Sequence, residues 1–225
     1  MRRIALVLVS LFLSASASAE IITFEYTGVI NTLRETIGNG DSRAVVSSNK
    51  IPGGVRVGND FHGTYSIDTN SAVAMSSATT TIYYNWAGMP GTTSITFDKS
   101  GTTASSPYAA GRVYVSHDGT SDYVSIDAGV SYGTRDSSYQ NIGFNFSGKG
   151  NLSNLAIPTS FNVADWYSAE ATLLWNTGSG YIDMTGMLTS VNRVSAVPEP
   201  ESYAMLLAGL GLVAGIAARR KQQRG

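Results

Sequence analysis

The stretch EIITFEYTG, residues 20–28, alternates apolar and polar side chains from Ile22 onward. Successive side chains of a β-strand point to opposite faces, so Ile22, Phe24 and Tyr26 fall on one face of this stretch. Alternation with a period of two residues indicates a strand that has one buried and one exposed face. The stretch therefore predicts that the folded part of the chain begins with a strand of a half-buried sheet.

The same two-residue period recurs along the chain as far as Val191. The further predicted strands are residues 61–67, 81–86, 94–97, 112–116, 123–128, 141–146, 171–175 and 181–191. Turn-forming residues separate them, at 52–54, 90–91, 118–119, 148–150 and 178–180. One short helix is expected within residues 155–171, at 163–168. Many short strands joined by glycine-rich turns predict an all-β fold, an antiparallel β-sandwich or jelly roll, over residues 20–196.

Charge is sparse and unevenly placed. Charged residues make up 14% of the 225 residues, against about 25% in an average soluble domain. Between Glu20 and Val197 there are 14 acidic and nine basic residues, a net charge of −5. This segment lacks the clustered Lys and Arg that nucleic-acid binding requires. The chain also has no cysteine, which excludes disulfides, thiolate nucleophiles and Cys-ligated metals.

The N-terminus has the three parts of a secretory signal peptide. The pair Arg2–Arg3 precedes a ten-residue apolar run, and small side chains follow at Ala17 and Ala19. The apolar run is too short to span a membrane. We expect signal peptidase to remove residues 1–19 by cutting before Glu20.

The C-terminus carries a second apolar segment. Residues 203–218 are 16 uncharged residues, and Arg219, Arg220 and Lys221 follow them directly. As a helix the segment would be about 24 Å long, close to the hydrocarbon thickness of about 30 Å. It shows no polar face of the kind found on a helix packed against a domain. We predict a transmembrane helix with the basic end in the cytoplasm, by the positive-inside rule.

A rigid step, Pro198-Glu199-Pro200, stands just before this apolar segment. The step, the apolar run and the basic cluster, in this order within residues 197–225, resemble a PEP-CTERM sorting signal. The resemblance implies that exosortase, a membrane protease or transpeptidase, recognises Pro198, Glu199 and Pro200. It further implies a transient membrane anchor, retention by the basic cluster, and delivery to the cell surface or to the extracellular polysaccharide of a biofilm.

The chemistry of the step suits a protease substrate. Proline lacks an N–H and hinders a helix, and a residue before proline is biased to extended backbone. Proteases generally bind extended segments. Glu199 is the one charge within the step, so we expect it to pair with a cationic group of the enzyme.

Catalytic and metal sites have little support in the sequence. The two histidines are His62, with Asp60 and Asp68 nearby, and His117, which precedes Asp118. A hydrolase triad needs a serine beside such a pair, but no G-x-S-x-G motif occurs. The side chain of His62 points to the opposite face of its predicted strand from that of Phe61, so it is expected on the surface. We expect no enzyme activity, no cofactor and no metal site.

The segment DGTSD, residues 118–122, has oxygen-bearing side chains of the type that bind Ca²⁺. Asp-Gly is also a strong turn dipeptide, and Asp-x-Asp-x-Asp spacing is absent. We therefore interpret the segment as a hairpin turn.

Aromatic residues provide a third candidate site. Tyr83 alternates with Asn85 and Tyr84 with Trp86, so one pair is expected in the core and the other in solvent. Tyr84, Trp86 and Trp166 are candidate glycan contacts, although core packing also accounts for large aromatics in a sandwich.

These observations favour an exported, non-enzymatic protein with a structural or adhesive role in extracellular polysaccharide. A carbohydrate-binding, lectin-like module is the alternative, and a secreted hydrolase is a third. An open aromatic groove would favour the lectin, and a histidine beside a carboxylate in a deep cleft would favour the hydrolase.

Overall fold

The computed structural model describes residues 21–37, 40–85, 90–128, 140–176 and 179–194. The expected signal peptide, Trp86, the Pro198-Glu199-Pro200 step, the apolar run 203–218 and the basic cluster lie outside these ranges. Within them, no helix has the length and apolar character needed to cross a membrane. The chain divides into two units, Met1–Val194 and Ser195–Gly225, and the strands described below belong to the first.

Strands make up nearly all of the regular structure. They are β1 (Ile21–Ile37), β2 (Asp41–Val45), β3 (Ser47–Ser48), β4 (Val55–Arg56), β5 (Asp60–Asp68), β6 (Ala72–Ser76), β7 (Thr80–Tyr84), β8 (Pro90–Phe97), β9 (Thr103–Tyr108), β10 (Arg112–His117), β11 (Asp122–Ala128), β12 (Gln140–Gly148), β13 (Trp166–Asn176) and β14 (Gly180–Val194). One 3-10 turn, η2 (Val163–Asp165), precedes β13.

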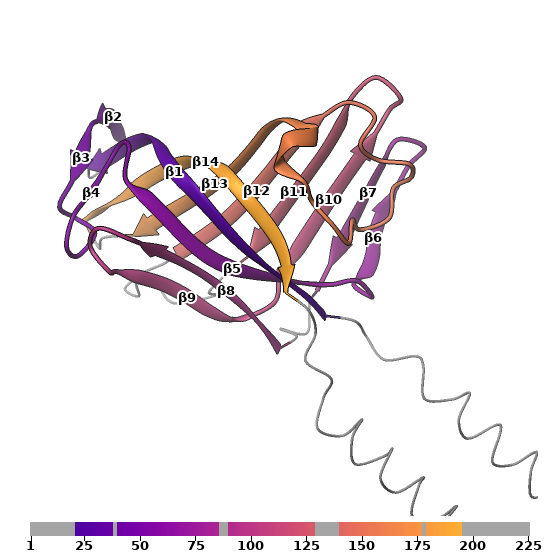
Figure 1. Ribbon diagram of the computed structural model, residues 1–225, viewed down its shortest axis with the longest axis horizontal. Coiled ribbons are helices and arrows are strands. Elements are labelled where there is room, and N and C mark those ends of the chain that lie inside the picture. Colours follow the sequence, from indigo (N-terminus) through magenta and orange to yellow (C-terminus); the bar gives the residue numbers. More distant parts are fainter. Residues whose placement is uncertain (1–20, 38–39, 86–89, 129–139, 177–178, 195–225) are drawn as a thin grey trace, which may run out of the picture. The chain divides into compact units, whose positions relative to one another are not determined.

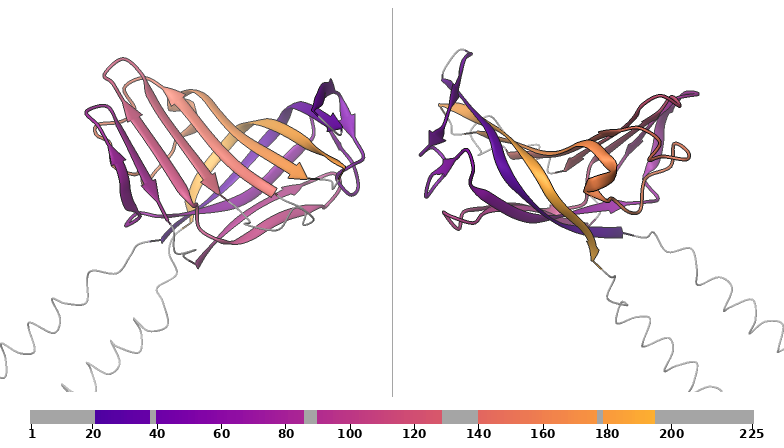
Figure 2. Two further views of the ribbon diagram at one scale, coloured as in Figure 1. Left: turned by 180° about the vertical axis from the view of Figure 1, so that it is seen from behind. Right: turned by 45° about the horizontal axis from the view of Figure 1, so that its top comes forward.

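Twelve of these strands form one sheet, in the order β6-β7-β10-β11-β12-β13-β14-β1-β5-β8-β9, with β2 paired to β1 (Figure 1). Every pairing in it is antiparallel. The short strands β3 and β4 pair with each other. Figure 2 shows the sheet from behind and tilted, so that its twist can be followed from β7 to β9.

The first and last strands of the unit lie side by side. β1 pairs with β14 from Thr23 opposite Val194 to Ile37 opposite Gly180. Ile21, at the start of β1, and Val194, at the end of β14, therefore lie near each other at the same end of the sheet. The β1–β14 pairing lies wholly within residues 23–194 and involves neither expected address segment.

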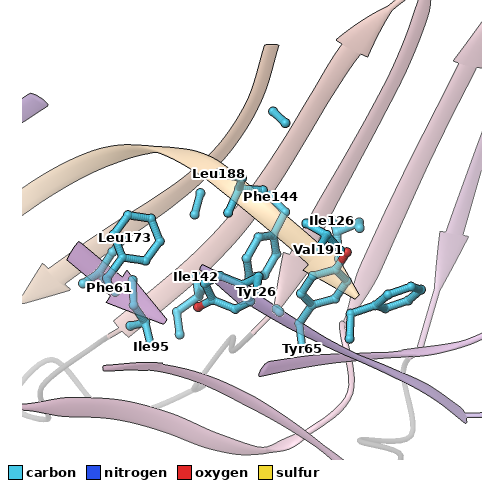
Figure 3. Packing of buried hydrophobic residues seen from close by; sticks show 14 of the residues in the cluster. Tyr26, Phe61, Tyr65, Ile95, Ile126, Ile142, Phe144, Leu173, Leu188 and Val191 are labelled. Carbon is cyan, nitrogen blue, oxygen red and sulfur yellow. The ribbon is translucent and has the colours of Figure 1, made fainter. Parts of the chain in front are cut away.

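The sheet curls, so strands that are distant in its order share one core. The ring of Phe144 on β12 lies 4.3 Å from that of Tyr65 on β5 and 4.9 Å from that of Tyr26 on β1. In the sheet itself, β13 and β14 separate β12 from β1. Figure 3 shows these rings packed between the two arms of the curl. All residues of the described core lie between Ile22 and Val191, so residues 21–194 have a self-contained core.

Two glycines allow the backbone to approach the core closely. The buried ring of Phe61 lies against Gly28 on β1 and Gly186 on β14, where an added Cβ would overlap the ring. Both lie near register shifts in the β1–β14 pairing. Such bulges bend a strand and increase its twist, which favours the curl.

The all-β antiparallel prediction is confirmed, but the sandwich takes a different form. A sandwich packs two separate sheets face to face, whereas here one continuous sheet folds over its own core. Each strand predicted from alternation is present. β2, β3, β4, β6 and β9 were not predicted.

Two local predictions are wrong. The helix expected at 163–168 is only the single turn η2, and Trp166 begins β13 by pairing with Gly148. Asn162 caps that turn by accepting a hydrogen bond from the N–H of Ala164. The turn expected at residues 90–91 instead begins β8, where Pro90 pairs with Tyr108.

Candidate functional site: a polar pocket framed by residues 150–166

The connection between β12 and β13 is a long loop that lies against the core side of the sheet (Figure 1). Ile157 and Phe161 are buried, and Leu152, Leu155 and Val163 pack against the core. Apolar residues spaced along a loop fasten it to the core, because each one loses contact with water. The loop is therefore a packed part of the fold.

Aromatic stacking holds the second half of the loop. The ring of Phe161 lies 4.4 Å from that of Phe146 on β12 and 5.4 Å from that of Phe24 on β1. Trp166, at the start of β13, contacts Phe146 at a centroid distance of 5.6 Å. Offset and edge-on aromatic pairs at these distances are favourable beyond the area they bury. The position of Trp166 is thus set by the rings beneath it.

A buried carboxylate holds the first half. Asp122, at the start of β11, accepts hydrogen bonds through Oδ2 from the N–H groups of Asn151, at 2.5 Å, and Leu152, at 3.1 Å. Its Oδ1 lies 2.6 Å from Nδ1 of His117. Burial acts to raise the pKa of Asp122, but the bonds from His117 and from the two backbone N–H groups prevail and lower it. Asp122 is therefore ionised and anchors the loop to the β10–β11 hairpin.

Tyr83 on β7 provides a third attachment. Its hydroxyl donates to the carbonyl of Leu155 at 2.7 Å, and burial raises its pKa. Asp122, Phe146 and Tyr83 thus hold the loop at three places from three different strands. Such anchoring pre-organises whatever surface the loop presents.

The surface presented is a pocket of about 670 Å³, lined by residues 150–154, 156–162, 165 and 166. We call it the loop pocket. Asn154 and Asn162 use their side-chain oxygens to accept from backbone N–H groups two residues further on. Their amide NH₂ groups remain as donors. With the carboxylate of Asp165 and the part-exposed indole of Trp166, they give the pocket donors, acceptors and an aromatic surface.

The structure separates the aromatic residues predicted as glycan contacts. Trp166 lines the loop pocket, whereas Tyr84 pairs with Arg112 across β7 and β10 and hydrogen-bonds to its guanidinium group. Because side chains alternate along β7, Tyr84 faces away from the side that Tyr83 shares with the loop. Trp86 lies outside the described residues. Tyr84 and Trp166 therefore do not line one pocket, and glycan contact by any of the three aromatics stays a prediction.

The histidines also find different partners from those nearest in sequence. His62 is exposed, as predicted, and its Nδ1 lies 2.5 Å from Oδ1 of Asp98. The pair stands on the outer face of the sheet, where His62 lines a shallow groove of about 400 Å³ together with Thr27, Thr64 and other polar residues. His117 serves the loop anchor through Asp122 rather than Asp118. Nearness in sequence did not predict these partners, because pairing between neighbouring strands determines which side chains lie side by side.

The segment 118–122 forms the hairpin turn between β10 and β11. Asp118 accepts hydrogen bonds from Thr120 and Ser121, which lower its pKa. Asp122 is turned into the fold, so the two carboxylates do not converge. Among the described residues, no three His, Asp or Glu side chains gather into a metal-binding group.

Two of the three anchors of the loop, Asp122 and Tyr83, carried no signal in the sequence for this role. Asp122 was considered only as a possible calcium ligand, and Tyr83 only as one member of an alternating pair. Their roles depend on a loop that follows them by 29 to 72 residues. Only the aromatic character of Trp166 pointed to this pocket.

Comparison with known protein families identifies a sorting motif near the C-terminus. Residues 196–221 match the family model of the PEP-CTERM protein-sorting motif. Among curated proteins, none matches the chain. The match covers the Pro198-Glu199-Pro200 step, the apolar run and the basic cluster, on which the resemblance rested. The chain thus carries a PEP-CTERM protein-sorting motif, which supports export and sorting by exosortase at the membrane.

Proposed function

We propose that the β unit, once exported, is a non-enzymatic adhesive protein that binds sugar residues of extracellular polysaccharide through the loop pocket. The observation that carries the proposal is the position of Trp166 beside amide, hydroxyl and carboxylate groups in a pocket of about 670 Å³. The proposal assigns both the adhesive role and the lectin-like sugar binding to the loop pocket.

The chemistry of the pocket suits a pyranose ring. The C–H face of a sugar packs on an indole, while its hydroxyls exchange hydrogen bonds with amides and carboxylates. Ligand sites usually combine an apolar surface with a few directional polar groups, largely preformed. Here the apolar surface is the indole of Trp166, and the polar groups are those of Asn154, Asn162 and Asp165.

Binding is expected to fall at least tenfold in Trp166→Ala, because a stacking surface worth about 1.4 kcal/mol is lost. The measurement is a glycan array followed by titration calorimetry, with residues 20–194 as the protein. Tyr167→Ala is the matched control, since Tyr167 is the next residue, is 79% exposed and does not line the pocket.

Because Trp166 also packs on Phe146, Asp165→Asn provides a second test on an exposed side chain. It removes a charged acceptor without touching the core, and weaker binding is again expected. Wild-type protein that binds no glycan, or equal losses in Trp166→Ala and Tyr167→Ala, would contradict the proposal.

The route to the surface completes the proposal. The signal peptide carries the β unit across the inner membrane, and the helix 203–218 holds it there with Arg219, Arg220 and Lys221 in the cytoplasm. Exosortase then acts near Pro198, Glu199 and Pro200. The protein reaches the cell surface or the polysaccharide outside it.

Mass spectrometry of the mature protein is expected to show a chain that begins at Glu20 and lacks the basic tail. Glu199→Ala is expected to retain the tail, because the step loses its one charge. Glu201→Ala removes the neighbouring carboxylate outside the step and serves as the control. An intact C-terminus in wild-type protein would refute the processing, and normal cleavage of Glu199→Ala would refute the role of Glu199.

A further inference from the structure

The two ends of the sheet differ in how their outer edges are protected. β6 and β9 are the end strands, each hydrogen-bonded to one neighbour within the described residues. An end strand presents unpaired N–H and C=O groups, which are a template for another strand. Proteins usually block such edges with charge, proline or a covering segment, or limit them by a short strand or a bulge. β9 contains Pro107, which lacks an N–H.

β6 is short and bulged, but it carries neither charge nor proline. From Thr69 to Met89 the sequence contains no charged residue and no proline. All five residues of β6 are exposed, and two are large and apolar: Val73 is 57% and Met75 58% exposed. The short length and the bulge limit the pairing to a few residues, but no charge or proline on this apolar edge opposes it.

We propose that β6 pairs antiparallel with β6 of a second copy of this chain, which joins two sheets into one across a two-fold axis. In such a pairing the same strand faces itself, so a charged residue on it would be brought close to the same charge on the partner strand. β6 has none, and therefore no like charges oppose each other. Val73 and Met75, exposed in the single chain, gain apolar neighbours from the partner strand.

The bulge and the short length of β6 limit the extent of the pairing. The register with β7 shifts between Val73 and Met75, and a bulge increases the local twist. The strand is five residues long, so the interface is far smaller than the roughly 1,600 Å² of a typical stable complex. The dimer therefore forms reversibly and is favoured where the protein is concentrated. This inference does not depend on sugar binding.

Sedimentation velocity of residues 20–194 over a range of concentrations tests the proposal. A single cooperative thermal transition first establishes that each sample is folded. Wild-type protein is expected to show a monomer–dimer equilibrium, and Val73→Lys and Met75→Lys are expected to weaken it at least tenfold. Val46→Lys is the control, because Val46 is 69% exposed and lies away from β6.

The absence of cysteine allows a second measurement. Met75→Cys introduces the one thiol of the chain, and oxidation is expected to yield a disulfide-linked dimer, whereas Val46→Cys remains mostly monomeric. Wild-type protein that stays monomeric at all concentrations would overturn the proposal. So would an equilibrium that Val73→Lys and Met75→Lys leave unchanged, or that Val46→Lys weakens equally.

Discussion

Replacing Phe144 with alanine is expected to lower the free energy of unfolding by about 3–5 kcal/mol, the usual cost of removing a buried phenylalanine. Phe144 is fully buried and packs on both Tyr65 and Tyr26. Its ring connects β12 with β5 and β1 across the curl, so the cavity opens where the two arms of the sheet meet. Urea denaturation of residues 20–194 measures the loss.

Phe144→Leu is the matched control, because it keeps most of the apolar volume and is expected to cost less than half as much. Tyr167→Ala removes a large but exposed ring and is expected to change stability by less than about 0.5 kcal/mol. Nearly equal stability of Phe144→Ala and wild type would mean that the curl does not depend on this contact.

The second large effect is expected at Asp122. Asp122→Ala removes the acceptor of two backbone N–H groups and the partner of His117. Because hydrogen bonds to a charged group contribute about 1.5–3 kcal/mol each and buried donors are left unpaired, a loss of about 3 kcal/mol is expected. Asp41→Ala removes the same charge from an exposed strand and is the control.

The same anchor makes stability depend on pH. The pKa of Asp122 is lower in the folded protein than in the unfolded chain, so its contribution is fully present above the unfolded value of about 3.9. It is lost as the pH falls through the folded pKa. Glu35 also has a lowered pKa, with hydrogen bonding to Ser48 as the largest cause. The difference between wild type and Asp122→Ala isolates Asp122, and it is expected to shrink in acid; a constant difference would contradict the anchor.

The strands that the sequence predicts are those buried on one face. In β5, β11 and β14 the core takes every second residue along much of the strand, and that one-sided burial is what the alternation records. β6, with the sequence AVAMS, is exposed on both faces. It has no burial pattern to record, so no period appears in its residues. Both end strands, β6 and β9, were unpredicted, and of the two it is β6 that carries neither charge nor proline.

The candidate site divides in the same way. Trp166 is recognisable as an aromatic residue that sugars favour, but its place depends on Phe146 and Phe161, and that of the loop depends on Asp122 and Tyr83. Hydrogen bonds between residues 29 and 72 positions apart leave no local period. The sequence pattern also could not show that Trp166 lines the loop pocket whereas Tyr84 lies beside Arg112.

The sequence by itself determined the sorting motif at residues 196–221, because the order of its rigid step, apolar run and basic cluster is a property of the sequence alone. It determined the all-β class as well, since alternation is a local consequence of burying one face. Only the tertiary structure decided that the sheet is continuous and curled, which loop is anchored over the core, and which edge is left open. Those features arise from contacts between residues far apart in the chain, whose free energy exists only once the sheet has closed on its core.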